Sequence, residues 1–239
     1  MIKINKISKS YKGKTVLSDI DFSTEKGTCV ALVGENGSGK TTLLRIMLDM
    51  IPPDSGNVAF DEISIAKSFP EHLKKQIGAY LNDDMLIEDL TGKEYLSFIA
   101  KFYQTDFEQK MNELLKIFQF EDVEKFEGEK IYNYSLGMKR KIGLISVLLH
   151  DPLYLILDEP FSSLDFKVVH ALLDYLNNFK PSTHIIMTTH VLSYIDQIAD
   201  KVILLKDGEI RFNGETSELE LENVEKITTL LNTSVKSEE

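Results

Sequence analysis

The chain has 239 residues, 43% of them hydrophobic, and its 27 basic and 38 acidic side chains give a net charge of -11. Such a chain can bury a sizeable core, and its acidic balance disfavours general binding to nucleic-acid backbones or anionic lipid surfaces. Its single cysteine, Cys29, excludes a disulfide within one chain. Its first residues lack the apolar stretch of a secretory signal, and it has no uninterrupted apolar run of about 18 residues, so we expect a cytoplasmic protein that does not itself span a membrane.

Two alternating patterns begin the chain, over 2–8 and 16–22, and they predict antiparallel strands around the turn Lys12-Gly13-Lys14. After them, short apolar runs rich in β-branched residues alternate with helical stretches. This alternation indicates an α/β fold with a mostly parallel sheet wrapped by helices. The predicted strand and helix pairs are 29–33 with 41–50, 154–157 with 167–179, and 184–188 with 192–199, followed by a strand at 201–205.

The pattern changes between Asn82 and Leu149, where amphipathic helices are predicted at 92–103, 107–118 and 138–149 with no convincing strand between them. We interpret the region from about 82 to 150 as an α-helical subdomain inserted into a domain that runs from 1 to 215. Asp207-Gly208 predicts a hairpin turn. Residues 216–239 are expected to form an acidic C-terminal helical tail that ends in a frayed, solvated segment.

A phosphate-binding loop is predicted from Gly34 to Thr41, which fits G-x-x-x-x-G-K-[ST] between a buried strand and a helix. Glycines let backbone N–H groups surround phosphates, and the helix that follows offers its positive end. Lys40 can reach the terminal phosphates, and the Thr41 hydroxyl can bind Mg²⁺. The predicted nucleotide-binding residues of this segment are Gly34, Glu35, Asn36, Gly37, Ser38, Gly39, Lys40, Thr41 and Thr42. The sequence therefore predicts a P-loop NTPase core, with an N-terminal antiparallel β subdomain and the inserted helical subdomain.

Two carboxylates follow the apolar strand predicted at 154–157. Asp158 stands where a carboxylate can hold Mg²⁺, directly or through water, beside the phosphates. Adjacent residues at the end of a strand point in different directions, so Glu159 can address an attacking water. A general base contributes about 10² to 10⁴ in rate. Our hypothesis is that the chain hydrolyses ATP with Mg²⁺ as cofactor and with Glu159 positioning or deprotonating the water.

With these residues in place, the chain resembles the ATP-binding subunit of an ABC transporter from about Ile2 to Asn213. The segment Tyr134-Ser135-Leu136-Gly137-Met138 is similar to the family signature, usually Leu-Ser-Gly-Gly-Gln, and lies about twenty residues before Asp158. The family's other markers stand in the family's order: Tyr11, the phosphate loop, Asp158-Glu159, the D-loop at Ser163-Leu164-Asp165, and His190. The resemblance implies that Tyr11 stacks on adenine, that Asp165 belongs to the nucleotide-binding set, and that His190 contacts the γ-phosphate during catalysis.

The signature also predicts a partner. Ser135 and the Gly137 backbone precede a predicted helix, and the N-terminus of a helix attracts anions. In the family this site meets the γ-phosphate held by another subunit. The resemblance therefore implies that two chains, either two copies or this chain and a homologous one, sandwich two ATP molecules. Leu136 and Met138 depart from the usual Gly and Gln, but Ser135 and Gly137 are retained.

One departure concerns the Q-loop, where the family has Gln after the strand at 77–81. Asn82 stands at this position, followed by Asp83 and Asp84. Asn keeps the amide oxygen but is one methylene shorter, so a contact between Asn82 and Mg²⁺ is expected to be weaker or mediated by water. An alignment shifted by one residue places Asp83 there instead.

The resemblance implies work on a separate integral membrane permease, whose coupling helix enters a groove near Asn82 to Leu90. We therefore expect a chain located at the inner face of the cell membrane through its permease. The segment Ser-Leu-Gly-Met-Lys and the short tail favour an exporter of a drug, antibiotic or peptide over an importer, and the substrate is not readable from this chain. The alternative is a soluble ABC ATPase acting on ribosomes or DNA. The net charge of -11 and the single ATP-binding domain disfavour that alternative, and we expect no nucleic-acid partner.

Overall fold

The computed structural model describes residues 1–65, 69–81, 85–103, 107–120 and 122–219. The chain divides into two units. Unit 1 comprises Met1–Phe69 and Ile186–Glu239, and unit 2 comprises Pro70–Ile185. None of the described helices is long and apolar enough to cross a bilayer.

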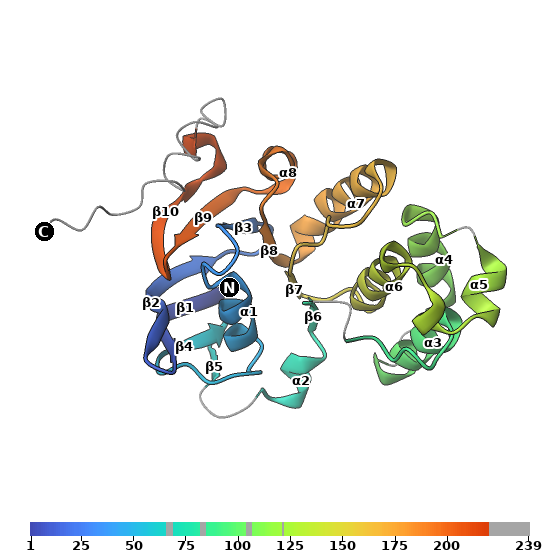
Figure 1. Ribbon diagram of the computed structural model, residues 1–239, viewed down its shortest axis with the longest axis horizontal. Coiled ribbons are helices and arrows are strands. Elements are labelled where there is room, and N and C mark those ends of the chain that lie inside the picture. Colours follow the sequence, from blue (N-terminus) through green and yellow to red (C-terminus); the bar gives the residue numbers. More distant parts are fainter. Residues whose placement is uncertain (66–68, 82–84, 104–106, 121, 220–239) are drawn as a thin grey trace, which may run out of the picture. The chain divides into compact units, whose positions relative to one another are not determined.

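The first sheet of unit 1 arises from alternating side chains. Strand β1 (Ile2–Tyr11) buries Ile2, Ile4 and Ile7 and pairs in antiparallel fashion with β2 (Lys14–Thr24). The predicted antiparallel pair is thus confirmed, and both strands are longer than predicted. Two further strands, β4 (Ser55–Phe60) and β5 (Ile63–Ile65), complete a sheet of order β2-β1-β4-β5 (Figure 1). The sequence analysis did not predict these two strands.

The second set of strands in unit 1 carries the phosphate loop. All five side chains of β3 (Cys29–Val33) are buried, as expected of a strand covered on both faces. It pairs in parallel with β9 (Lys201–Lys206), and β9 pairs in antiparallel fashion with β10 (Glu209–Glu215). The predicted hairpin at Asp207-Gly208 is confirmed, with φ angles of 50° and 78°. The order of these strands is β10-β9-β3-β8, where β8 spans His184–Thr189.

Two helices of unit 1 have nearly the predicted positions. Helix α1 (Lys40–Met47) begins one residue earlier and ends three residues earlier than predicted. Helix α8 (Leu192–Ile198) ends one residue before the predicted end. The short 3-10 helix η4 (Thr216–Leu219) begins the predicted tail, and residues 220–239 of that tail lie outside the described residues.

Unit 2 contains the predicted strand β7 (Tyr154–Leu157), which pairs in parallel with β6 (Ile77–Tyr80). Helix α3 (Gly92–Tyr103) has the predicted bounds, and α4 (Glu108–Ile117) lies within the predicted range. Helix α6 (Leu136–Leu148) begins two residues before the predicted start, and α7 (Phe166–Phe179) begins one residue before it. In Figure 1, α3, α4 and α6 lie side by side, and α6 packs on β6.

Shorter elements of unit 2 were not predicted. They are the helices α2 (Glu71–Lys74) and α5 (Val123–Gly128), and the 3-10 helices η2 (Ile131–Asn133) and η3 (Lys180–Ser182). The expected absence of a strand among the lobe helices holds for the described residues, where Thr91 and Lys130 form only an isolated bridge. The two units do not follow the predicted domain boundaries, and both the helical subdomain at about 82–150 and the division at 215 stay predictions.

Candidate functional site

The phosphate loop joins β3 to α1 in unit 1. Gly37 and Gly39 have φ angles of 86° and 108°, in the left-handed region that L side chains rarely adopt. Gly39 is also the N-cap of α1, so the loop turns directly into the helix whose positive end faces it. The predicted residues from Gly34 to Thr42 therefore lie together in one loop and first helical turn.

Lys40 lies across this loop. Its side chain is buried, and Nζ donates hydrogen bonds to the carbonyl oxygens of Gly34, at 2.6 Å, and Glu35, at 3.0 Å. An ammonium that can exchange these carbonyl oxygens for phosphate oxygens is the donor that a triphosphate requires. Thr41 and Thr42, in the first turn of α1, are half-buried, whereas Glu35, Asn36 and Gly37 are exposed.

The structure supports the fit of an anion in this loop. Ser38 is 6% exposed, and its buried Oγ has no hydrogen-bond partner among the residues that the structure describes. A buried hydroxyl usually has a partner, so this group is available to a ligand. The loop also packs closely on β9, since a Cβ on Gly34 would meet the backbone oxygen of Leu205 and lie 2.7 Å from Ser38 Oγ. The donors and the close approach to the backbone suit the phosphates of ATP, and Thr41 offers a hydroxyl to Mg²⁺.

Two more predicted residues belong to unit 1. Tyr11 is the last residue of β1 and is 46% exposed, with Lys9 Nζ 5.6 Å from its ring centroid. An exposed ring of this kind can stack on a base. His190 directly follows β8 and is exposed.

Asp158 and Glu159 belong to unit 2. Asp158 follows β7 and is 8% exposed, and its N–H donates to the Tyr80 carbonyl at 2.7 Å. Glu159 is half-buried with a φ of 49°, a left-handed conformation that is uncommon outside glycine. The two successive carboxylates thus leave the strand end on backbones of different conformation, which agrees with two separate tasks. Sequence reasoning missed Tyr80, whose role depends on the pairing of β6 with β7.

The signature residues lie at the start of α6. Ser135 is the N-cap, and its Oγ accepts a hydrogen bond from the Met138 N–H at 3.3 Å. Gly137 is half-buried, and a Cβ there would lie 3.0 Å from the Ser163 carbonyl oxygen. The signature and the D-loop are therefore neighbours within unit 2, and the N-terminal end of α6 attracts anions.

Asp165 is the N-cap of α7. Its carboxylate accepts from the Val168 N–H at 3.0 Å and lies 3.4 Å from Lys141 Nζ of α6. Burial opposes its ionisation, but the hydrogen bond from Val168 and the Lys141 charge together lower the pKa of Asp165 below its usual value. Asp165 thus has a structural role, as the cap of α7 and the partner of Lys141, in addition to the nucleotide-binding role that the resemblance implies. The predicted Q-loop residues Asn82, Asp83 and Asp84 lie outside the described residues.

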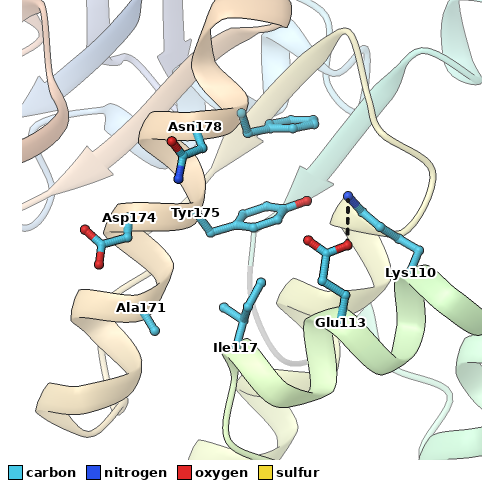
Figure 2. Close-up of a pocket in the computed structure, with 8 residues that line it drawn as sticks. Lys110, Glu113, Ile117, Ala171, Asp174, Tyr175 and Asn178 are labelled. Carbon is cyan, nitrogen blue, oxygen red and sulfur yellow. Dashed lines mark ion pairs between the residues drawn. The ribbon is translucent and has the colours of Figure 1, made fainter.

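A cavity of about 510 Å³ lies elsewhere in unit 2, between α4 and α7 (Figure 2). Figure 2 shows Lys110 and Glu113 of α4 facing Tyr175 of α7, and Lys110 Nζ is 3.9 Å from Glu113 and 2.9 Å from Asp151. None of the predicted nucleotide-binding residues lines this cavity. This cavity is therefore not part of the predicted nucleotide-binding site.

Comparison with known proteins identifies the family. The ABC transporter family model matches residues 17–162. The uncharacterized ABC transporter ATP-binding protein YxlF of Bacillus subtilis is 31% identical over 96% of this chain and 76% of its own length. The linearmycin resistance ATP-binding protein LnrL of Bacillus subtilis is 28% identical over 92% of this chain and 70% of its own length.

Solved structures agree. An ATP-binding subunit of an ABC transporter aligns with a TM-score of 0.86 and 26% identity, over 97% of this chain and 99% of that one. A dimeric bacterial ABC transporter cassette, MJ0796, aligns with a TM-score of 0.79 and 26% identity, over 90% of this chain and 98% of that one. The chain therefore belongs to the ABC transporter family, and it is an ATP-binding subunit with the ATPase domain of that family.

Proposed function

We propose that two copies of this chain, or this chain and a homologous subunit, bind ATP between them and use its hydrolysis to drive a separate membrane permease that exports a drug, antibiotic or peptide. The observation that carries this proposal is the phosphate loop with its buried Lys40 and the unpartnered Ser38 Oγ, in a chain that also holds Ser135 at the start of α6. One chain carries both a phosphate cradle and a second anion site.

In this proposal, the loop from Gly34 to Thr42 holds the phosphates of ATP, and Tyr11 stacks on the adenine. Lys40 exchanges its two carbonyl acceptors for phosphate oxygens, and Ser38 Oγ donates to one of them. Thr41 and Asp158 hold Mg²⁺, with Asn82 or Asp83 contributing from the Q-loop position. Bound there, Mg²⁺ would neutralise charge on the phosphates as the terminal bond breaks.

Glu159 acts on the attacking water. Its carboxylate positions the water or takes its proton as the water oxygen approaches the γ-phosphorus, and His190 contacts the γ-phosphate. The fixed left-handed turn at Glu159 supports this role, because a defined backbone limits the directions that its side chain can take. Strain of this kind is common at active sites and costs about 1–3 kcal/mol.

The second anion site explains the need for a second chain. The N–H groups at the start of α6, beside Ser135 and Gly137, would receive the γ-phosphate bound to the opposite phosphate loop, so each bound ATP adds contacts between subunits. The similarity to a dimeric ABC transporter cassette supports this arrangement. Two identical chains related by a two-fold axis would form two equivalent sites.

A permease requires a docking surface, and unit 2 offers a candidate beside the predicted coupling groove. A cavity of about 320 Å³ is lined mainly by apolar and aromatic side chains, including Met85, Leu86 and Tyr95. Met85 and Ile87 are 47% and 43% exposed, so their apolar side chains are accessible to an apolar surface of a partner. Such a partner would hold the chain at the cytoplasmic face of the membrane. The similarity to a linearmycin resistance protein supports the exporter reading.

The test is dimerisation of the variant Glu159→Gln. This variant should bind ATP and Mg²⁺ without turning it over, and sedimentation should show a dimer with ATP and a monomer without it. Lys40→Met, which removes the phosphate contact, is the matched control and should remain monomeric. A Glu159→Gln chain that stays monomeric under saturating ATP, or that hydrolyses at the normal rate, would contradict the proposal. Copurification of a membrane protein, and not of ribosomes or DNA, tests the transport role.

A further inference from the structure

Arg140 reaches from the signature helix to the turn that carries Glu159. It lies on α6, five residues after the N-cap Ser135, and is half-buried. Its Nη1 donates to the carbonyl oxygens of Glu159, at 3.2 Å, and Ser162, at 2.9 Å. One guanidinium group thus holds both ends of the turn from Glu159 to Ser162.

This turn has an unusual backbone. Glu159 and Ser163 have φ angles of 49° and 59°, so two residues that are not glycine adopt the left-handed conformation. Residues persist there only when their surroundings fix them. Within the turn, the Ser162 N–H donates to the Glu159 carbonyl at 3.2 Å. The Arg140 hydrogen bonds therefore act on the carbonyl of one left-handed residue and on the peptide group that precedes the other.

Tyr80 fixes Arg140 in turn. Arg140 Nε donates to the Tyr80 hydroxyl at 3.2 Å, and its Cζ lies 5.6 Å from the centre of the Tyr80 ring. Tyr80 is 2% exposed and packs on α6 where Gly143 leaves room for it, since a Cβ on Gly143 would lie 3.1 Å from Tyr80 Cδ2 and closer still to Cε2. The Tyr80 carbonyl also accepts from the Asp158 N–H. One tyrosine thus anchors both Asp158 and the arginine that holds Glu159.

We propose that Arg140 is a positioning residue for ATP hydrolysis, which sets the direction of the Glu159 carboxylate by holding the Glu159–Ser162 turn. The inference rests on the proposed role of Glu159. Because Arg140 lies on the helix that begins with Ser135, it also gives the signature end of α6 a direct connection to the turn in the same chain. A lysine could not replace it fully, because an ammonium cannot reproduce the planar fork that serves the tyrosine and both carbonyls.

The experiment compares four variants of the full chain: Arg140→Met, Arg140→Lys, Tyr80→Phe and Lys139→Met. Lys139 is the matched control, because it is the neighbouring cation on α6 and pairs with Glu88 Oε1 at 2.6 Å instead of the turn. The measurements are kcat and KM for ATP, the melting temperature, and amide hydrogen exchange in the peptide that covers 158–166.

Arg140→Met should lower kcat about 10²-fold, the loss expected when a reacting group is misplaced by about 1 Å, while KM changes less than about two-fold. Arg140→Lys and Tyr80→Phe should lose about ten-fold or less, since the first removes part of the guanidinium fork and the second removes one of its hydrogen-bond acceptors. Exchange in 158–166 should accelerate in Arg140→Met and stay unchanged in Lys139→Met. If Arg140 had only a structural role, Arg140→Met would lower the melting temperature but would not lower kcat selectively while KM stayed nearly constant.

Two results overturn the inference in distinguishable ways. If Arg140→Met keeps its turnover or its slow exchange in 158–166 while Glu159→Gln loses turnover, Arg140 does not position the turn and the proposed function stands. If Glu159→Gln itself retains turnover, the proposed role of Glu159 fails and the inference fails with it.

Discussion

Replacing Gly34 by alanine tests whether the phosphate loop needs its close approach to β9. The added Cβ would meet the backbone oxygen of Leu205 and would lie 2.7 Å from Ser38 Oγ and 3.3 Å from the Leu205 carbonyl carbon. The Leu205 oxygen belongs to a paired strand and cannot rotate away as a flexible side chain can. The loop itself must therefore move.

The size of the effect follows from these contacts. Overpacking of this kind costs about 1–3 kcal/mol, and the melting temperature of a domain of this size falls about 2–4 °C for each kcal/mol. A loop displaced by about 1 Å also misaligns the N–H groups and Lys40, which costs about 10²-fold in turnover. We expect Gly34→Ala to melt roughly 5 °C lower and to lose most of its ATP affinity.

The assay combines thermal unfolding with titration of a fluorescent ATP analogue. Gly128→Ala is the matched control, since a Cβ there meets nothing within 4 Å. Gly128 ends α5, so alanine should leave ATP binding unchanged and stability equal or slightly higher. A Gly34→Ala chain that binds ATP as tightly as the parent at an unchanged melting temperature would refute this account of the loop.

Two further predictions concern unit 2. The hydroxyl of buried Tyr134 accepts a hydrogen bond from the Gly92 N–H at 3.1 Å and donates one to the Lys125 carbonyl at 2.9 Å. Tyr134→Phe should therefore lower the free energy of unfolding by about 1–3 kcal/mol. An unchanged urea midpoint would argue against these hydrogen bonds. Burial lowers the pKa of His150 to about 4, whereas the unfolded chain takes up this proton near pH 6.5. Stability should therefore fall, by up to about 3 kcal/mol, as pH drops from 6.5 towards 4, and His150→Phe should lack this part of the slope in urea titrations across that range.

The parts of the fold and of the candidate site that depend on local sequence patterns could be predicted from the sequence. The phosphate loop lies between β3 and α1 as predicted, and Ser135 caps α6 because its residue type favours that position. Helix α5 was missed because six residues are too few for a periodic pattern, although Asp122 caps it by accepting from the Lys125 N–H. β4 was missed because its role depends on pairing with β1, which is distant in the sequence, and β5 has three residues and pairs with β4.

Tertiary contacts account for the rest of the candidate site. No local pattern indicates that Glu159 adopts a left-handed conformation, or that Tyr80 anchors Asp158 through its carbonyl. In the sequence, nothing distinguishes Arg140 from an ordinary charged residue on a helix. Its contacts with Tyr80 and Glu159 follow from the packing of α6 on β6. The adenine contact of Tyr11 and the phosphate contact of His190 stay predictions.

The central claim is that each catalytic site combines the phosphate loop and Glu159 of one chain with the Ser135 end of another. Mixing two inactive variants tests it directly. Glu159→Gln lacks the proposed base but keeps its signature, and Ser135→Glu keeps the base but places a negative charge where the opposite phosphate would lie. A mixed dimer would contain one intact site.

We expect each variant alone to hydrolyse ATP at the background rate. When the two variants are mixed in equal amounts, half of the randomly formed dimers contain both. Each mixed dimer has one intact site out of two, so the mixture should recover up to about a quarter of the parent activity. A mixture that forms dimers and yet stays at the background rate would contradict the claim that the site is shared between two chains.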